Sequence, residues 1–227
     1  LQPAAVNREL AALRRMFSLG VRAGILPHRP HVAMLDESGN VREGFLEPAE
    51  FNAVCAHLPT YLQDVARFAY LTCWRIGAVR ALEWRDVDFR ARTLQLRASS
   101  AKNKRAKTLP LGGDVLALLR RRAADRDPAV PFVFTRNNAP VGDFRKAWHK
   151  AAKAAGVGPL LFHDLRRSAA RNAIRAGVPE RVVMELGGWR TRSVLDRYNV
   201  TSEKDLGEAL ERTSRYVTKR GAEKPKV

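Results

Sequence analysis

A histidine and an arginine stand three positions apart in the stretch FHDLRRSAARNAIRAG, residues 162–177. Apolar residues recur here at every fourth position and a glycine closes the stretch, which predicts a helix over about 163–176. Because positions i and i+3 lie on one helix face, His163 and Arg166 can reach the same anionic group. The pattern HxxR arises often by chance, so alone it fits equally the solvated face of a basic helix.

Three other stretches carry reactive or cationic side chains. Arg75 stands in LTCWRIGAVRALEW between two predicted helical stretches, where a lone arginine is usually a cap or a surface residue. Lys102 belongs to a loop with four cations in SSAKNKRAKTLP, which by itself indicates a solvated hairpin tip. Tyr198 follows Trp189 in the basic segment GGWRTRSVLDRYNV, and most tyrosines pack at the edge of a core. None of these features alone decides a function.

Together, these side chains could cleave a DNA phosphodiester bond without a metal ion. Such a reaction needs a nucleophile that attacks the phosphorus and a proton donor for the departing 5′ oxygen. It also needs guanidinium groups where negative charge grows on the non-bridging oxygens. The sequence offers a tyrosine, a lysine and arginines as candidates for these roles.

The sequence lacks the common motifs that bind metal ions or nucleotide cofactors. It has no glycine-rich phosphate loop, no HExxH pattern and no cysteine and histidine set at zinc spacing. Glu83, Asp86 and Asp88 could be imagined as a carboxylate cluster for two metal ions, but a helix end and the following turn are the simpler interpretation. His28 and His31 lie in a proline-containing segment and are interpreted as linker residues. We therefore expect no metal ion and no cofactor.

The charge of the chain points to an anionic partner. Its 227 residues include 41 lysines and arginines against 23 acidic residues, a formal net charge of +18 with a pI near 10.9. A charge this large is costly in one compact body unless an anionic partner offsets it. Double-stranded DNA is the leading candidate, because no long apolar run or basic amphipathic anchor supports a membrane. The apolar content of 45% is that of a globular core and not of a disordered basic tail.

Cysteine usage and the first residues give two further expectations. Cys55 and Cys73 each lie among apolar residues, so no disulfide framework is expected, which fits a reducing cytoplasm. The chain begins LQPAAVNREL, without methionine and already in a helical pattern, which predicts a segment cut from a longer protein.

Helical periodicity dominates the chain on both sides of one irregular segment. An amphipathic helix ending at Gly24 is predicted first, and residues 26–44 lack periodicity and carry prolines and glycines, which indicates a linker. Alternation in VDFRARTLQLRA predicts strands joined by a tight turn, and TLPL resumes an extended run after the interruption AKNKRAK. Further helices are predicted around 47–58, 61–74, 77–84, 113–124, 143–155, 163–176, 179–187, 192–198 and 203–215. The expected fold class is mainly α with one small antiparallel β-sheet (α+β).

The order and spacing of these elements resemble the tyrosine recombinases, the family of phage-type integrases, across residues 45–217. Arg75 in TCWR matches the first arginine box of the family. Lys102 ahead of TLPL matches the lysine of a β-hairpin, and His163 with Arg166 matches the HxxR box. Together with the tryptophan and the tyrosine described next, five elements match in order.

Trp189 after a glycine matches the family's next position, and Tyr198, nine positions later, matches its nucleophile. The resemblance implies that Tyr198 forms a 3′-phosphotyrosine with DNA and that His163 shares or accepts its proton. It implies that Lys102 protonates the 5′ oxygen, that the two arginines neutralise the non-bridging oxygens and that the indole donates one hydrogen bond. Neither a metal ion nor ATP is then required.

The same resemblance extends to domains and partners. It implies that residues 1–25 are the C-terminal helix of a truncated core-binding (SAM-like) domain, ahead of the catalytic domain. A helix at about 203–217 would link protomers into a homotetramer on DNA, and residues 218–227 would be a disordered basic tail. The protein would act in the cytoplasm of a bacterium, as part of a mobile element. Cations expected to contact DNA are Lys104, Arg105, Lys107, Arg167, Arg171, Arg190 and Arg192.

Two departures from the family pattern leave alternatives open. Cys73 replaces the usual glycine before the first arginine, and Ala78 replaces an acidic residue that commonly supports the site. A type IB topoisomerase would use a similar pocket on one strand as a monomer. A DNA-binding regulator descended from a recombinase would keep the fold and lose the cleavage.

Overall fold

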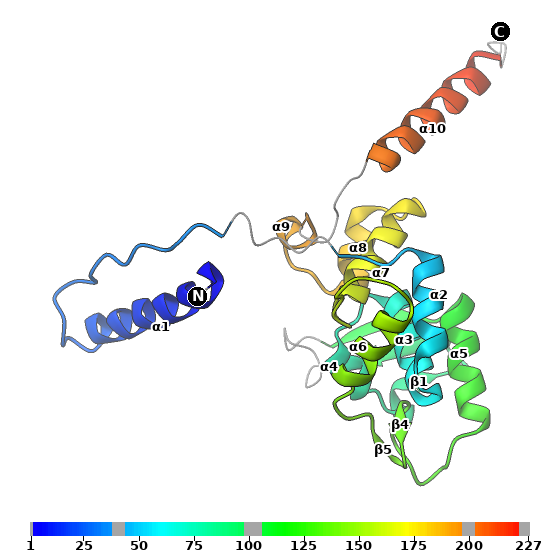
Figure 1. Ribbon diagram of the computed structural model, residues 1–227, viewed down its shortest axis with the longest axis horizontal. Helices are drawn as coiled ribbons and strands as arrows, with labels where there is room; N and C mark the ends of the chain where they lie inside the picture. The colour runs from blue at the N-terminus through cyan, green and yellow to red at the C-terminus, as the bar shows by residue number, and fades with distance from the viewer. Residues whose placement is uncertain (1, 38–43, 98–105, 197–202, 223–227) are drawn as a thin grey trace. The chain divides into compact units, whose positions relative to one another are not determined.

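The chain divides into two compact units, Leu1–Glu43 and Gly44–Val227 (Figure 1). The computed structural model describes residues 2–37, 44–97, 106–196 and 203–222. No helix within these ranges is both long and apolar enough to cross a membrane.

The first unit consists of α1, Pro3–Arg22, and the segment that follows it. The helix ends where the sequence predicts, just before Gly24, whose φ of +71° is a left-handed conformation that glycine adopts without strain. Asn7 is buried, and its side chain exchanges two hydrogen bonds of 2.8 Å with the backbone of Leu35. The first part of the predicted linker therefore returns along α1.

The second unit is mainly helical and carries two small antiparallel sheets, which confirms the expected fold class in its main feature. The described helices are α2 (Pro48–His57), α3 (Thr60–Thr72), α4 (Ile76–Arg80), α5 (Gly113–Ala124), α6 (Arg145–Ala154), α7 (Asp164–Arg175), α8 (Glu180–Gly187), α9 (Arg192–Asp196) and α10 (Glu203–Ala222). The strands are β1 (Val87–Asp88), β2 (Thr93–Leu96), β3 (Lys107–Pro110), β4 (Thr135–Arg136) and β5 (Ala139–Pro140).

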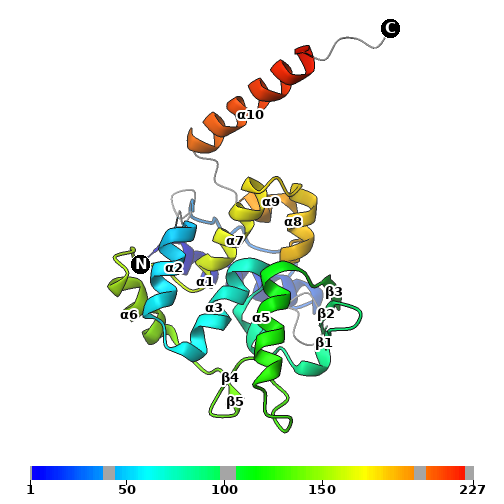
Figure 2. The ribbon, with the colours of Figure 1, turned by 90° about the vertical axis from the view of Figure 1, so that its right-hand side faces the viewer.

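Helix α3 lies at the centre of this unit and packs against α2, α5 and α7 (Figure 2). Its apolar residues recur at helical spacing, and Val65 and Phe68 are fully buried. The Phe68 ring meets those of Trp74 and Phe134 edge-to-face, with centroid distances of 5.7 and 5.3 Å. Aromatic pairs in this geometry add to simple area burial. The chain just beyond α3, where Arg75 follows Trp74, is thereby fixed to the core.

The first sheet has the order β1–β2–β3 and is antiparallel throughout. Leu94 pairs with Leu109 and both are buried, while Leu96 pairs with Lys107 at the other end of the ladder. The predicted alternation of TLQL is confirmed by this pairing. The ladder holds both ends of the loop that contains Lys102.

A second sheet, formed by β4 and β5, was not expected, so the prediction of a single sheet is wrong. The two strands are joined by Asn137 and Asn138, with φ of 50° and 61°. Two consecutive residues at positive φ form a two-residue hairpin turn, and asparagine tolerates this conformation better than most residues. The dipeptide Asn-Asn was the local signal for this hairpin.

A second apolar cluster joins α3, α7, α8 and α9. It contains Cys73 after α3, Ala169 and Ala170 on α7, Val183 on α8, and the residues Trp189 and Leu195 that flank and enter α9. The cluster packs together the segments that carry Arg75, Arg166 and Trp189.

Helix α10 extends from Glu203 to Ala222, beyond the predicted end at residue 215. Residues 218–222, which were expected to begin a disordered tail, are helical, and residues 223–227 lie outside the described ranges. Leu206, Leu210 and Val217 are exposed on the helix, as the predicted narrow apolar face requires.

Replacing Gly187 by alanine tests the close packing at the end of α8. A Cβ atom built on Gly187 overlaps the Trp189 indole, whereas one built on Gly77 in α4 meets nothing within 4 Å. Overpacking of this kind typically costs about 1–3 kcal/mol, so Gly187→Ala is expected to lower the free energy of unfolding by that amount. Gly77→Ala is the matched control and should be neutral or stabilising, because alanine has a higher helix propensity than glycine. Equal denaturant midpoints for the two variants would contradict the packing argument.

Candidate active site

The chain turns sharply at the end of α3 and presents Arg75 at the start of α4. Cys73 caps α3 with φ of 58° and ψ of 16°, a left-handed conformation that residues other than glycine rarely adopt. Burial raises the pKa of the Cys73 thiol to about 12, so the thiol is neutral. Arg75 is the N-cap residue of α4 in an extended conformation, and its side chain makes no cap hydrogen bond. Because of this turn, Arg75 does not continue α3 and instead precedes α4.

Arg75 has no carboxylate partner among the described residues. Ala78 stands on the first turn of α4, at the position where the family commonly has an acidic residue, and it is buried. The missing carboxylate leaves the Arg75 guanidinium with its donors available to an incoming anion.

The Arg166 guanidinium is almost fully buried, with 2% of the residue exposed. One terminal nitrogen donates to the backbone carbonyl of Cys73, and the other donates to the carbonyl of Gly187 at 2.7 Å. The guanidinium carbon also lies 4.2 Å from the centroid of the Trp189 ring, within cation–π range. These contacts fix the orientation of Arg166 before any ligand arrives.

The Trp189 ring is positioned by a tight helix end. Gly188 caps α8 with φ of 66°, and the backbone N–H of Trp189 donates to the carbonyl of Met184 at 3.0 Å. This is a glycine-dependent C-cap, in which the residue after the glycine reaches back over the last turn. The glycine before the tryptophan is therefore a structural requirement for placing the ring beneath Arg166.

His163 stands at the N-terminus of α7 and is exposed. Its pKa is lowered, first by desolvation among neighbouring side chains and then by the charge of Arg166, with smaller contributions in the same direction from Arg75 and Arg167. Asp164 opposes the shift. The imidazole is therefore neutral at pH 7 and can accept a proton. The structure thus brings together His163, Arg166 and Arg75, which come from two separate stretches of sequence.

Four of the predicted site residues, Lys102, Lys104, Arg105 and Tyr198, lie outside the described residues. Their neighbours on the chain are nonetheless well anchored. Leu195 on α9 is fully buried in the second apolar cluster, three residues before the tyrosine.

Arg97 anchors the chain where it enters the lysine-bearing loop. Its guanidinium donates to Glu83 at 2.6 Å and to the carbonyl of Ala81 at 3.0 Å, and it pairs with Asp86 at 3.1 Å. Asp86 also accepts from the backbone of Glu83 in a capping box around a single 3₁₀ turn. The first two members of the imagined carboxylate cluster therefore have a structural function, as the simpler interpretation predicted.

Arg167 and Arg171, which were expected to contact DNA, are buried in this structure. The Arg171 guanidinium lies 3.5 Å from the centroid of the Phe45 ring and 3.3 Å from Asp205. Helical periodicity placed these arginines away from the apolar stripe, but neighbouring segments cover that side as well. Arg190 and Arg192 are exposed, as expected of cations that contact DNA. The DNA contacts themselves stay a prediction.

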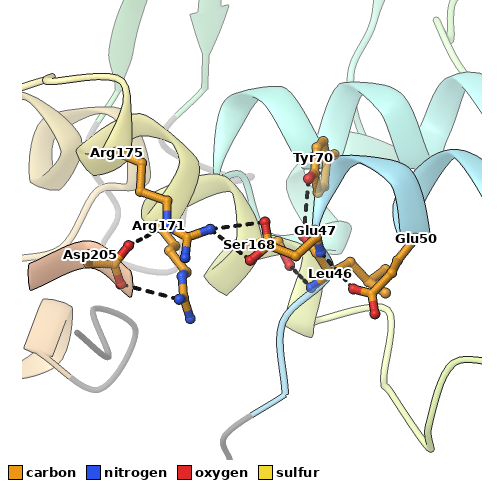
Figure 3. A network of polar contacts seen from close by, with 8 residues as sticks. All are labelled: Leu46, Glu47, Glu50, Tyr70, Ser168, Arg171, Arg175 and Asp205. Carbon is orange, nitrogen blue, oxygen red and sulfur yellow. Dashed lines mark hydrogen bonds and ion pairs between the residues drawn. The ribbon is translucent and has the colours of Figure 1, made fainter. Parts of the chain in front are cut away.

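A polar network at the other side of α7 was not predicted from the sequence (Figure 3). Arg175 binds the carboxylate of Glu47 at 2.7 and 2.9 Å and that of Asp205 at 2.6 Å. Ser168 accepts a hydrogen bond of 2.8 Å from the backbone N–H of Leu46. The network joins the first residues of the second unit, helix α7 and the start of α10. Its pairs are far apart in sequence, so no local pattern could reveal it.

The sequence profile of the phage integrase family matches residues 45–204, which include all of these segments except most of α10. The chain belongs to this family. Over 212 residues it is 26% identical to the integrase of Salmonella phage P22, a match that covers 87% of this chain and 54% of that protein. Over 167 residues it is 27% identical to the tyrosine recombinase XerC of Corynebacterium glutamicum, covering 70% and 53%. The chain spans about half the length of these two relatives.

Solved structures of integrases share the fold of this phage integrase family member. A lambda integrase dimer bound to a core site matches with a TM-score of 0.67 and 17% identity, over 83% of this chain and 73% of that one. The Tn1549 transposon integrase in complex with a circular intermediate DNA matches with a TM-score of 0.74 and 16% identity, over 93% and 80%. The fold of the tyrosine recombinase catalytic domain, expected from the ordered boxes, is confirmed.

The lowered pKa of His163 can be measured by an NMR titration of its imidazole protons. We expect a pKa below the ordinary value of about 6.5, because desolvation and nearby cations both disfavour the imidazolium. Arg75→Met should raise this pKa, since it removes one of the positive charges. Arg181→Met, on the exposed side of α8, is the charge-matched control and should leave it unchanged. An unchanged His163 pKa in Arg75→Met would show that His163 and Arg75 do not share a site.

Proposed function

We propose that this chain carries the strand-cleaving site of a site-specific DNA recombinase, with Tyr198 as its nucleophile. The observation that carries the proposal is the grouping of Arg75, His163 and Arg166 around one place, with Trp189 against Arg166. An imidazole that stays neutral beside two guanidinium groups suits a reaction in which a proton is accepted while negative charge grows on a phosphate.

In the proposed reaction, the Tyr198 hydroxyl oxygen attacks the scissile phosphorus and the bond to the 5′ oxygen breaks. The products are a 3′-phosphotyrosine and a free 5′ hydroxyl. An unperturbed phenol has a pKa of about 10, so the attack at neutral pH needs a base. Neutral His163 takes the phenolic proton, and Lys102 gives a proton to the 5′ oxygen.

The two arginines stabilise the charge that develops on the non-bridging oxygens. Arg166 is held by two carbonyls and an indole, so little reorganisation is needed when that charge appears. Arg75 has no carboxylate partner among the described residues, so its guanidinium can donate two parallel hydrogen bonds to the same phosphate. Because the phosphotyrosine conserves the bond energy, a second strand's 5′ hydroxyl can reverse the step with neither ATP nor a metal ion.

The tyrosine serves the site of its own chain in this proposal. Leu195 is fully buried beside Trp189, and Tyr198 follows three residues later. Three residues of extended chain span at most about 11 Å. Because this connection is short, we propose that each tyrosine serves the site of its own chain and that cleavage proceeds in cis.

Double-stranded DNA is the proposed substrate, and a homotetramer on DNA is the proposed assembly. The net charge of +18 supports the first, because phosphate contacts dominate binding by such chains. The exposed apolar residues Leu206, Leu210 and Val217 of α10 support the second, since a narrow apolar face needs a groove in which to dock. That groove could belong to the same domain or to a neighbour, and the family resemblance favours a neighbour. Residues 1–25 are proposed to complete a core-binding domain, and the protein is proposed to act in the cytoplasm.

Covalent trapping tests the nucleophile. On a nicked suicide substrate that carries the protein's own target site, the wild type should form an adduct that survives a denaturing gel. Tyr198→Phe should form none and should bind DNA with unchanged affinity, because only the phenolic oxygen is lost. An adduct at full yield in the variant would refute the assignment. Unchanged binding without any wild-type adduct would instead favour a DNA-binding regulator.

Mixing two inactive variants tests the cis arrangement. Arg75→Ala keeps the nucleophile and Tyr198→Phe keeps the cation pocket, so cleavage in trans would restore the adduct in a mixture. We expect no restoration, because the short connection from Leu195 to Tyr198 favours the site of the same chain. An adduct from the mixed variants would contradict the cis arrangement and leave the reaction type unchanged.

A bridging thiol tests the role of Lys102. Lys102→Ala should slow cleavage strongly on a normal substrate and should regain most of the rate when a 5′ sulfur replaces the leaving oxygen. A thiolate leaves without a proton, so it does not need a general acid. No recovery on the sulfur substrate would exclude Lys102 as the proton donor.

A further inference from the structure

Lys107, at the first position of β3, lies beside the anchoring contacts of Arg166 and is not a peripheral residue. Its position is set by the sheet, because Lys107 pairs with Leu96 in the β2–β3 ladder. Both Cys73 and Arg166 act electrostatically on its ammonium group. These are the two residues joined by the hydrogen bond that fixes the guanidinium. The ammonium therefore lies near Arg166, since its neighbour Glu185 stands two residues before Gly187, whose carbonyl accepts from the Arg166 guanidinium.

The Lys107 ammonium lacks hydrogen-bond acceptors within the described ranges. Its Nζ is buried and has no hydrogen-bond acceptor among the described residues. Desolvation accordingly lowers the pKa of Lys107, and Arg166 acts in the same direction. An ammonium has three donors, and burying it without acceptors is unfavourable. A buried cation that lacks acceptors beside a proposed phosphate site is suited to an anionic ligand.

Glu185 is the acidic neighbour of this ammonium. Its Oε2 lies 3.9 Å from Nζ, too far for a hydrogen bond, and its side chain is 80% exposed against 21% for that of Lys107. Glu185 stands in the last turn of α8, where a negative charge opposes the helix dipole. The carboxylate is thus a loose, solvated counterion that can move aside at little cost.

We propose that Lys107 is a further phosphate-binding residue of this site and that Glu185 is its counterion until a DNA phosphate replaces it. The proposal rests on the proposed function and adds a residue and a competing carboxylate to the pocket. Lys107 would then bind charge, which distinguishes it from Lys102 as proton donor. It would contact the reacting phosphate from β3, where the β2–β3 pairing positions it.

The first test combines salt-dependent binding with single-turnover cleavage. Lys107→Met removes the charge and keeps an unbranched side chain that suits a buried place. It should lower the slope of log affinity against log salt by about 0.9, the loss of one phosphate contact. It should also slow adduct formation about 10²-fold, as for loss of one preorganised donor. Lys107→Arg should retain most of the rate, and Arg120→Met, an exposed charge on α5, is the control for cleavage.

Two further arms separate this role from a structural or acid role. Glu185→Gln should tighten DNA binding at low salt in the wild type and have no effect in the Lys107→Met background. The 5′-thiol substrate should not rescue Lys107→Met. A wild-type cleavage rate and salt slope in folded Lys107→Met would overturn the proposal, as would equal effects of Glu185→Gln in both backgrounds. Rescue by the thiol would make Lys107 a proton donor and also overturn it.

The controls distinguish the failure of this proposal from that of the proposed function. If the wild type forms no adduct, the proposed function fails, but the salt slopes and the Glu185 cycle require only DNA binding. They still decide whether Lys107 contacts a phosphate.

Discussion

The buried guanidinium of Arg166 joins segments that are far apart in the sequence. Its two carbonyl acceptors, on Cys73 and Gly187, are the backbone groups that close α3 and α8, so the cation lies at two helix C-termini. A positive charge there is favoured by both helix dipoles, and hydrogen bonds to a charged group contribute about 1.5–3 kcal/mol each. Arg166 therefore has two roles. The same contacts orient its guanidinium for a phosphate and hold α3, α7 and α8 together.

Helix α7 carries this cation near its N-terminus and makes further contacts along its length. Ser168 binds the backbone of Leu46, and Arg175 bridges Glu47 and Asp205. The HxxR helix is thus held by the entry to the second unit and by the start of α10. A displacement of α7 would have to break both sets, which explains how a helix with arginines on several sides remains a precise support for the site.

The sequence predicted most of the helices and the β2–β3 pairing because their periodicity is local. It missed the β4–β5 hairpin, where the signal was only the pair Asn137 and Asn138 within two very short strands. It also assigned Arg167 and Arg171 to DNA contacts and gave no sign that both are buried. Periodicity reports the apolar stripe of a helix, but it does not report charged side chains that Phe45 and Asp205 cover from distant segments.

The order and spacing of Arg75, His163, Arg166 and Trp189 were visible in the sequence alone and were enough to indicate the family, since a family pattern consists of residue types in order. Only the tertiary structure decided what these residues contact. The capture of Arg166 by two helix ends, the lowered pKa of His163 and the position of Lys107 near Glu185 each depend on distances between elements. Electrostatic energies and hydrogen bonds fall off within a few ångströms, so they arise only when folding brings these elements together.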